Sequence, residues 1–310
     1  MKSAALCNGH LYHYLDHLAP LCDLLQIPLL TNDLKIEKMA HHYYPMVETR
    51  YIAPAVMTPH FLGSHFDTFF VTEKYTRKKL QKLIQTTCNK HVTFCYLPHG
   101  NSDKGLKNPA LNPFPEQELA LIYGAQMEER FCKSIPCKRI GNFRYDFYLR
   151  YKNFYDEFVQ KKLQLPNKKI YLYAPTWDDG ENGTTIFEKK DFPKEAHVIV
   201  KAHPLLFETH LAEMIALNPL TDFPLIYPLL ARTDAYIGDY SSIGYDFLTF
   251  DRPLYFCGSE ETELSKCGSP WPKENAPTCA EKRQKLYKKV FTLCVVLLPF
   301  LAQNFYTSIT

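Results

Sequence analysis

Two histidines in this sequence stand directly after apolar segments that are typical of buried β-strands. His99 follows the segment 92–97 and precedes Lys104 by five residues, and His203 follows the segment 197–202. An imidazole can accept a proton near neutral pH, and a lysine ammonium can hold a phosphate as a point charge. These positions could therefore support proton transfer beside an anionic group, although a single histidine in a loop often has no such role.

A second group of polar residues lies between two predicted strands, 235–237 and 254–256. Ser241 and Ser242 stand where the helix predicted over 243–250 would begin, so that strand, turn, helix and strand form one βαβ unit. The start of such a helix offers free N–H groups and the positive end of the helix dipole, which favour phosphate. Because serine is also a preferred N-cap, the interpretation of Ser241 as a plain cap stays open at this point.

The chain as a whole alternates strand and helix patterns, which is typical of α/β proteins. Polar residues follow several of the predicted strands, and Thr176 stands after the strand 169–174. Ligands of such sheets bind at the carboxyl ends of the strands. We therefore expect two Rossmann-like, doubly wound domains that face a cleft. The first is placed at 1–147 and the second at 148–310, with a basic and then apolar tail from about residue 269.

Individual segments give further expectations. The leucines between residues 10 and 28 recur at three- and four-residue steps and predict a helix. His13 and His17 have the spacing of metal ligands on one face of this helix, but no further ligand stands near them in the sequence. We therefore interpret them as solvated or as facing hydrogen-bond acceptors, and predict no metal site. Other expected elements are strands at 27–31, 67–72, 119–123 and 225–227, helices at 74–84 and 147–165, and a loop at 41–45.

Composition limits the class of protein. The chain has 310 residues and a formal net charge of +3, which argues against a nucleic-acid partner, because nucleic-acid-binding domains carry a strongly basic stripe. Its ten cysteines are scattered without a CxxC pair, Cys132 and Cys137 being the nearest two. Reduced thiols and a cytoplasmic location are therefore expected. The sequence shows neither a signal peptide nor an apolar run of the roughly 20 residues that cross a bilayer.

The C-terminal segment is basic over 281–289 and apolar over 290–302. The apolar run is shorter than a bilayer-spanning helix. Two interpretations stay open: a helix packed against the domain, and an anchor that lies on the inner face of a membrane. Peripheral membrane contact is kept as an expectation on the second interpretation.

Four motifs follow one another along the chain: His99-Gly100 with Lys104, Tyr173-Ala174-Pro175-Thr176-Trp177, Lys201-Ala202-His203-Pro204, and Asp239-Tyr240-Ser241-Ser242 with Asp246-Phe247 and Arg252-Pro253. Together they resemble the CDP-glycerol glycerophosphotransferase family, the teichoic acid primases and polymerases of cell-envelope synthesis. The resemblance covers residues 99–256. It implies a glycosyltransferase-B architecture and the transfer of glycerol phosphate, or another polyol phosphate, from a CDP-linked donor to a hydroxyl of a lipid-linked or glycan acceptor, with release of CMP.

The resemblance also implies roles for single residues. His99 is expected to be the general base that takes the acceptor's proton, and His203 the second histidine, which steadies charge on the pyrophosphate. The expected contacts of the donor phosphates are Ser241, Ser242, Lys104 and Thr176, and those of the donor polyol or ribose are Asp246, Asp239 and Arg144. The first domain would then bind the acceptor and the second the nucleotide donor, which is a substrate, so that no cofactor is implied.

Two departures from the family pattern keep other functions open. Asp178 stands after Trp177 where the family often has an arginine, and the resemblance fades after about Gly258. The first alternative is a nucleotide-sugar glycosyltransferase of the same architecture. The second is a non-catalytic remnant that binds a nucleotide-linked ligand.

Overall fold

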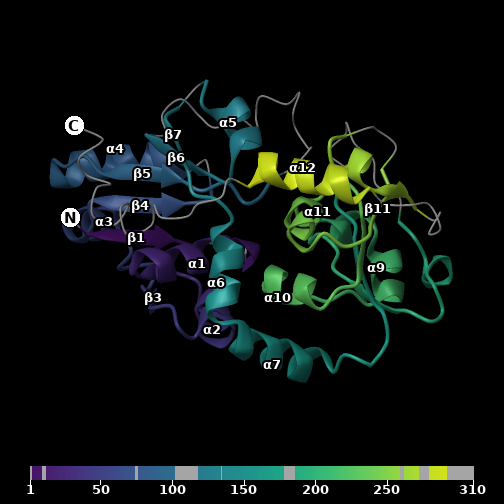
Figure 1. Ribbon diagram of the computed structural model, residues 1–310. Coiled ribbons are helices and arrows are strands. Elements are labelled where there is room, and N and C mark those ends of the chain that lie inside the picture. The colour runs from purple at the N-terminus through teal and green to yellow at the C-terminus, as the bar shows by residue number, and fades with distance from the viewer. Residues whose placement is uncertain are drawn as a thin grey trace. The chain divides into compact units, whose positions relative to one another are not determined.

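The computed structural model describes residues 2–8, 12–73, 76–101, 118–133, 135–177, 186–258, 262–271 and 279–291. This part of the chain forms two compact units, each built on one parallel sheet (Figure 1). The first unit holds the described residues up to Arg150, except Gly100 and Asn101, together with Phe291; the second holds Gly100, Asn101 and the described residues from Tyr151 to Val290. The α/β class with parallel sheets is confirmed. The predicted domain junction, between 147 and 148, falls inside α6 (Phe143–Arg150).

The sheet of the first unit has the strand order β3-β2-β1-β4-β5-β6-β7, with every neighbouring pair parallel. Its strands are β1 (Ser3–Leu6), β2 (Leu29–Thr31), β3 (Thr49–Tyr51), β4 (Thr68–Val71), β5 (Thr93–Tyr96), β6 (Leu119–Ile122) and β7 (Cys137–Arg139). All four residues of β4 are buried, as expected for a parallel sheet covered on both faces. The order reverses between β1 and β4, which makes the carboxyl ends of these strands the ligand-binding edge expected of a doubly wound sheet.

Helices connect these strands. They are the 3₁₀ turn η1 (Tyr12–Tyr14), α1 (Leu15–Leu25), α2 (Leu34–Tyr43), α3 (Pro59–His65), α4 (Thr76–Cys88), α5 (Ala125–Phe131) and α6. Their starts follow the usual chemistry of caps: Asp33 accepts from the second and third N–H groups at the start of α2, and Thr58 caps α3 just before a proline. The apolar face of α1 supplies the buried residues Leu15, Leu18 and Leu21.

The sheet of the second unit has the strand order β12-β11-β10-β8-β9 and is also parallel. Its strands are β8 (Ile170–Ala174), β9 (His197–Val200), β10 (Ala235–Gly238), β11 (Leu254–Phe256) and β12 (Ser269–Pro270). β8 is the first strand of this sheet along the chain and lies between β9 and β10, so the order reverses beside β8. The loops after β8 and β10 therefore meet at the switch point of the sheet, where doubly wound proteins bind ligands.

The second unit carries short helices and a longer C-terminal one. They are α7 (Lys152–Leu163), η3 (Lys189–Asp191), α8 (Leu206–Thr209), α9 (Leu211–Leu217), α10 (Ile226–Ala231), α11 (Ser242–Phe247), η4 (Leu248–Phe250), η5 (Ser265–Cys267) and α12 (Ala280–Val290). α12 buries Leu286 and Val290 and ties Arg283 to Asp251 by an ion pair of 2.9 Å. The basic segment 281–289 thus lies in a packed helix, while residues 292–310 lie outside the described residues.

Three expectations about local structure are wrong. Residues 225–227, predicted as a strand, lead into α10, whose residues Tyr227–Leu230 are all buried; an apolar run without a polar face does not distinguish helix from strand. The expected loop at 41–45 is mostly helical, because α2 continues to Tyr43. The single helix predicted over 147–165 is two helices, α6 and α7, which are separated at Tyr151.

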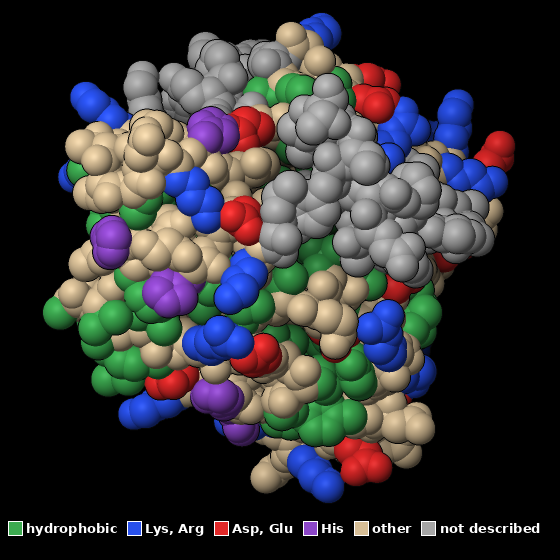
Figure 2. Space-filling view, turned by 90° about the vertical axis from the view of Figure 1, so that its left-hand side faces the viewer, with side chains coloured by type: hydrophobic (Ala, Val, Ile, Leu, Met, Phe, Trp, Pro, Cys, Tyr) green, Lys and Arg blue, Asp and Glu red, His purple; other side chains and the backbone are tan. Residues whose placement is uncertain are grey.

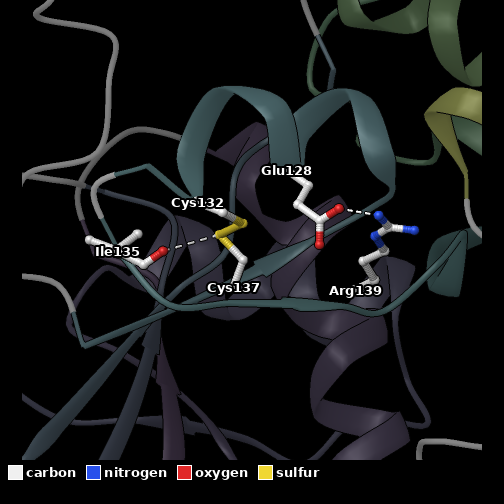
Figure 3. The surroundings of a disulfide bond; sticks show 5 residues. All are labelled: Glu128, Cys132, Ile135, Cys137 and Arg139. Carbon is white, nitrogen blue, oxygen red and sulfur yellow. Dashed lines mark hydrogen bonds and ion pairs between the residues drawn. A yellow bond between two sulfur atoms is a disulfide. The ribbon is translucent and has the colours of Figure 1, made fainter.

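A disulfide joins Cys132 and Cys137 at the turn between α5 and β7 (Figure 3). The turn brings the two Cα atoms to 5.6 Å, within the range that a disulfide bridges. Beside it, Glu128 and Arg139 form an ion pair between the same two elements. The expectation that all cysteines are reduced is therefore wrong for this pair, while the other described cysteines are free thiols.

The surface of the described residues mixes charges of both signs. Figure 2 shows one face on which lysine and arginine side chains alternate with acidic, histidine and apolar ones. Exposed ion pairs such as Arg50–Glu48 have the same mixed character. None of the helices in the described ranges has the length and apolar character that crossing a bilayer requires.

Candidate functional site

The switch point of the second sheet brings Thr176 and Asp239 together. Thr176 follows β8 and Asp239 follows β10, and both are buried. The backbone N–H of Thr176 lies 2.9 and 3.2 Å from the two carboxylate oxygens of Asp239 and donates to them. This bond joins two loops that are 63 residues apart in the sequence. Asp239 thus fixes the loop of Thr176 at the edge where a ligand of this sheet would bind.

Replacing Asp239 with alanine is expected to lower the free energy of unfolding by about 1–3 kcal/mol, because the buried N–H of Thr176 loses its acceptor. Asp239→Asn is the matched control, since its amide oxygen can still accept that hydrogen bond. Urea unfolding of both variants measures the difference. Equal losses in the two variants would show that the charge of Asp239, and not the hydrogen bond, is what stabilises the loop.

Ser241 and Ser242 lie at the start of α11, where they were predicted. The Ser241 hydroxyl accepts from the backbone N–H of Ile243 at 3.3 Å, which makes Ser241 the N-cap of the helix. Ser242 is the first helical residue, and both serines are partly exposed. The plain cap and the phosphate contact are compatible, because a hydroxyl that accepts one hydrogen bond keeps its own proton for another partner.

The other predicted donor contacts are buried polar residues. Asp246, on α11, is only 2% exposed and accepts a hydrogen bond of 3.1 Å from the Tyr227 hydroxyl of α10. Arg144, on α6 in the first unit, forms a buried ion pair with Asp16 of α1 and also donates to the backbone oxygen of Asp16 at 3.1 Å. Each of these contacts gives the residue a structural role, and the predicted donor contacts of both stay predictions.

His203 follows β9, next to β8 in the sheet. Its backbone N–H donates to the oxygen of Pro175 at 3.1 Å, which places it beside the loop of Thr176. Its ring lies 6.2 Å from that of Trp177, and its Nδ1 accepts from the backbone N–H of Leu205 at 3.3 Å. Because Nδ1 is an acceptor, the proton of the neutral ring is assigned to Nε2. His203 is therefore arranged as a hydrogen-bond donor through Nε2, which suits stabilisation of negative charge better than proton abstraction.

His99 follows β5 in the first unit and is exposed. Its ring lies among aromatic and imidazole rings at the start of α1: 5.4 Å from Tyr14, 6.1 Å from His13 and 6.5 Å from His17, measured between ring centroids. These residues follow β1, at the reversal of the strand order. The structure thus supplies a third histidine to the pair at 13 and 17, which sequence spacing alone did not show.

Of the two interpretations of His13 and His17, solvated or facing a hydrogen-bond acceptor, the first is wrong for His17. It is buried, and its Nδ1 lies 2.8 Å from the hydroxyl of Tyr123, which is itself fully buried. Burial, followed by the charge of Arg144, holds the pKa of His17 well below its usual range. Burial likewise raises the pKa of the Tyr14 phenol to about 12. His17 and Tyr14 are therefore uncharged at neutral pH.

The predicted phosphate contact Lys104 lies outside the described residues. Within the described ranges, no three histidine, cysteine or carboxylate side chains are placed so that they could hold a metal ion. The sequence did not show that Trp177 lies beside His203, or that Tyr14, His13 and His17 lie around His99. Their positions depend on strand order, which sequence patterns do not give.

Comparison with known proteins adds a family to this geometry. Residues 125–265 match the model of the CDP-glycerol:poly(glycerophosphate) glycerophosphotransferases. This segment is therefore similar to the glycerophosphotransferase family. It contains β8, β9 and β10 with the loops that follow them, and hence Thr176, His203, Asp239 and Ser241.

Two curated relatives of the chain are teichoic acid enzymes of Bacillus spizizenii. The chain is 38% identical over 107 residues to a teichoic acid glycerol-phosphate primase, a match that covers 32% of this chain and 28% of the relative. It is 30% identical over 161 residues to a teichoic acid ribitol-phosphate primase, covering 48% of this chain and 41% of the relative. These matches thus span less than half of the length of either relative.

Solved structures extend the likeness to the fold of nearly the whole chain. A structure of the wall teichoic acid polymerase TagF matches with a TM-score of 0.69 at 14% identity, covering 99% of this chain and 89% of the other. A UDP-GlcNAc 2-epimerase from Neisseria meningitidis, bound to UDP-GlcNAc, matches with a TM-score of 0.54 at 11% identity, covering 93% and 91% of the two chains. At these identities the likeness concerns the fold.

Proposed function

We propose that this protein transfers glycerol phosphate, or another polyol phosphate, from a CDP-linked donor to a hydroxyl of a lipid-linked or glycan acceptor, with release of CMP. The observation that carries the proposal is the glycerophosphotransferase match over 125–265. That segment holds the switch point of the second sheet, where Thr176 and Asp239 are joined. The teichoic acid primases among the relatives support the same substrate class.

In the proposed reaction the acceptor hydroxyl oxygen attacks the β-phosphorus of the donor. A new P–O bond forms, and the bond between the β-phosphorus and the bridging oxygen breaks, so that CMP leaves with that oxygen. His99 takes the proton of the acceptor hydroxyl. His203 and the serines at the start of α11 donate hydrogen bonds to the phosphate oxygens as negative charge shifts to the leaving group. The product is a phosphodiester, and the step requires no redox partner.

The direct test uses the full chain with CDP-glycerol and a lipid-linked acceptor, and follows CMP. Release that depends on the acceptor supports the proposal. Release of UDP or GDP from nucleotide sugars, with no CMP from any CDP-linked polyol, would replace it by a glycosyltransferase. A nucleotide-dependent rise of the melting temperature without any turnover would favour a non-catalytic binding protein.

The role of His203 is tested by two amide substitutions. His203→Asn keeps an oxygen that can accept from the N–H of Leu205 but lacks a donor in the place of Nε2. His203→Gln can place its amide N–H near that position. If His203 acts as a donor to phosphate, we expect CMP release by the glutamine variant to exceed that by the asparagine variant about ten- to hundredfold. Equal loss in both would instead indicate that His203 exchanges a proton.

A further inference from the structure

The hydroxyl of Tyr236 ends at the turn that holds the predicted phosphate contacts. Tyr236 is fully buried in β10, and its ring stacks on Phe247 of α11, with 5.5 Å between the ring centroids. The side chain therefore lies between the strand and α11 and points along β10. The reaction proposed above assigns no role to the Tyr236 hydroxyl.

Two glycines make room for this hydroxyl. A Cβ atom at Gly238 would lie 2.1 Å from the Tyr236 Oη, and a Cβ at Gly244 would lie 3.4 Å from it. Gly238 ends β10 and Gly244 lies in the first turn of α11, so Oη lies between the end of the strand and the start of the helix. The turn that joins them contains Asp239 and Ser241.

Within the described residues, the Tyr236 hydroxyl makes no hydrogen bond of good geometry. An unpaired buried hydroxyl costs about 1–3 kcal/mol, so such groups are rarely left without a partner. Because Oη lies beside Gly238 and Gly244, it is close to the turn between them, which carries the Ser241 hydroxyl. The pKa of Tyr236 agrees with this position: burial raises it well above its usual value, the charge of Asp239 adds to this, and the Ser241 hydroxyl opposes it.

The Ser241 hydroxyl has one proton to donate and two lone pairs that accept. One lone pair takes the N–H of Ile243 at 3.3 Å. We propose that the Tyr236 hydroxyl donates to the second lone pair, so that Ser241 can only donate its own proton, and donates it to a phosphate oxygen of the donor. Tyr236 is then a positioning residue, which acts on the ligand through Ser241.

The inference rests on the proposed function, because the phosphate is that of the nucleotide-linked donor. This arrangement of Tyr236 and Ser241 makes the turn selective for a ligand atom that accepts a hydrogen bond and carries no proton, such as a phosphodiester oxygen. It also gives Gly238 a purpose, since any side chain at that position would displace the phenol from Ser241.

The first test concerns the protein without ligand and compares urea midpoints of Tyr236→Phe in two backgrounds. In the wild type the substitution removes a hydrogen bond, and the midpoint is expected to fall. In the Ser241→Ala background it removes a hydroxyl that has lost its partner, and the midpoint is expected to stay or rise. A fall of the same size in both backgrounds would overturn the pairing and indicate another partner, such as Asp239 or Asp246. A rise in the wild type would show that the hydroxyl is unpaired.

The second test measures binding of CDP-glycerol by calorimetry. Tyr236→Phe is expected to weaken binding about three- to tenfold, the range of one neutral hydrogen bond. Adding Tyr236→Phe to Ser241→Ala is expected to cause no further loss. Tyr173→Phe is the matched control. The Tyr173 hydroxyl accepts from the backbone N–H of Phe187 at 3.1 Å in the same unit, so this variant loses a hydrogen bond in which Ser241 takes no part. Wild-type affinity in the Tyr236→Phe variant would overturn the positioning role.

The two tests separate this inference from the proposed function. If the wild type binds no CDP-linked compound, the proposed function fails and the role toward a donor phosphate fails with it, while the unfolding measurements still decide whether Tyr236 and Ser241 are paired. If CDP-glycerol binds and both tyrosine variants bind it equally well, the proposed function stands and the inference about Tyr236 is wrong.

Discussion

Replacing His99 with glutamine is expected to lower the rate of CMP release by about 10²–10⁴-fold, the usual contribution of a general base, with the affinity for CDP-glycerol unchanged. Glutamine can still form hydrogen bonds but cannot take a proton, so the loss falls on the chemical step. His99 is exposed at the end of β5 and therefore accessible to an acceptor. The measurement is kcat from CMP release, together with the dissociation constant of CDP-glycerol from calorimetry.

His65→Gln is the matched control for this prediction. His65 is an exposed histidine on α3 of the same unit. Within the part of the chain that the structure describes, its Nδ1 contacts the backbone oxygen of Phe61 in its own helix, at 2.8 Å, and its ring contacts the neighbouring phenylalanines. Its replacement is expected to leave both kcat and affinity unchanged. If the His99 variant retains wild-type CMP release, another group takes the acceptor's proton and the role of His99 must be given up.

The histidine beside His99 is disfavoured as an alternative proton acceptor. His17 lies 6.5 Å from His99, measured between the ring centroids, and is buried and close to Arg144. Both effects disfavour a second positive charge on His17. His17 is therefore a poor proton acceptor at neutral pH, and the proposed general base is His99.

Much of the fold could be predicted from the sequence because the signals are local. Apolar runs such as those of β4 and β5 mark strands that are buried on both faces, and the serine before α11 marks the start of a helix. The prediction failed where a local pattern is ambiguous. α10 is buried on nearly all sides, so its short apolar run resembles a strand, and Tyr151 divides a helical pattern that looks continuous.

The contacts within the candidate site could not be predicted, because they depend on which strands are neighbours. Thr176 meets Asp239 only because β8 pairs with β10 and not with β11. The pair His13 and His17 was visible from its spacing, but its closeness to His99 follows from the strand order β1-β4-β5. Residue types at strand ends thus indicated the ligand-binding edge, and strand order determines which of them meet.

Arg144 offers the second large effect, because its ion pair with Asp16 is almost completely removed from solvent. The two side chains are 2% and 7% exposed, and Asp16 also accepts from the Tyr44 hydroxyl at 3.1 Å. Arg144→Met leaves the carboxylate of Asp16 buried without its cation, and removal of one partner of a buried pair costs about 3–5 kcal/mol. We expect the free energy of unfolding, measured in urea, to fall by that amount.

Two further variants separate the structural role of Arg144 from the donor contact predicted for it. Asp16→Asn combined with Arg144→Met leaves no uncompensated charge and is expected to recover part of the lost stability. Arg50→Met makes the same substitution in the exposed pair with Glu48 and is expected to cost no more than about 1 kcal/mol. The double variant at 16 and 144 should also bind CDP-glycerol as the wild type does, since the ion pair lies wholly within the first unit. A restored fold with weakened binding would instead establish Arg144 as a contact of the donor.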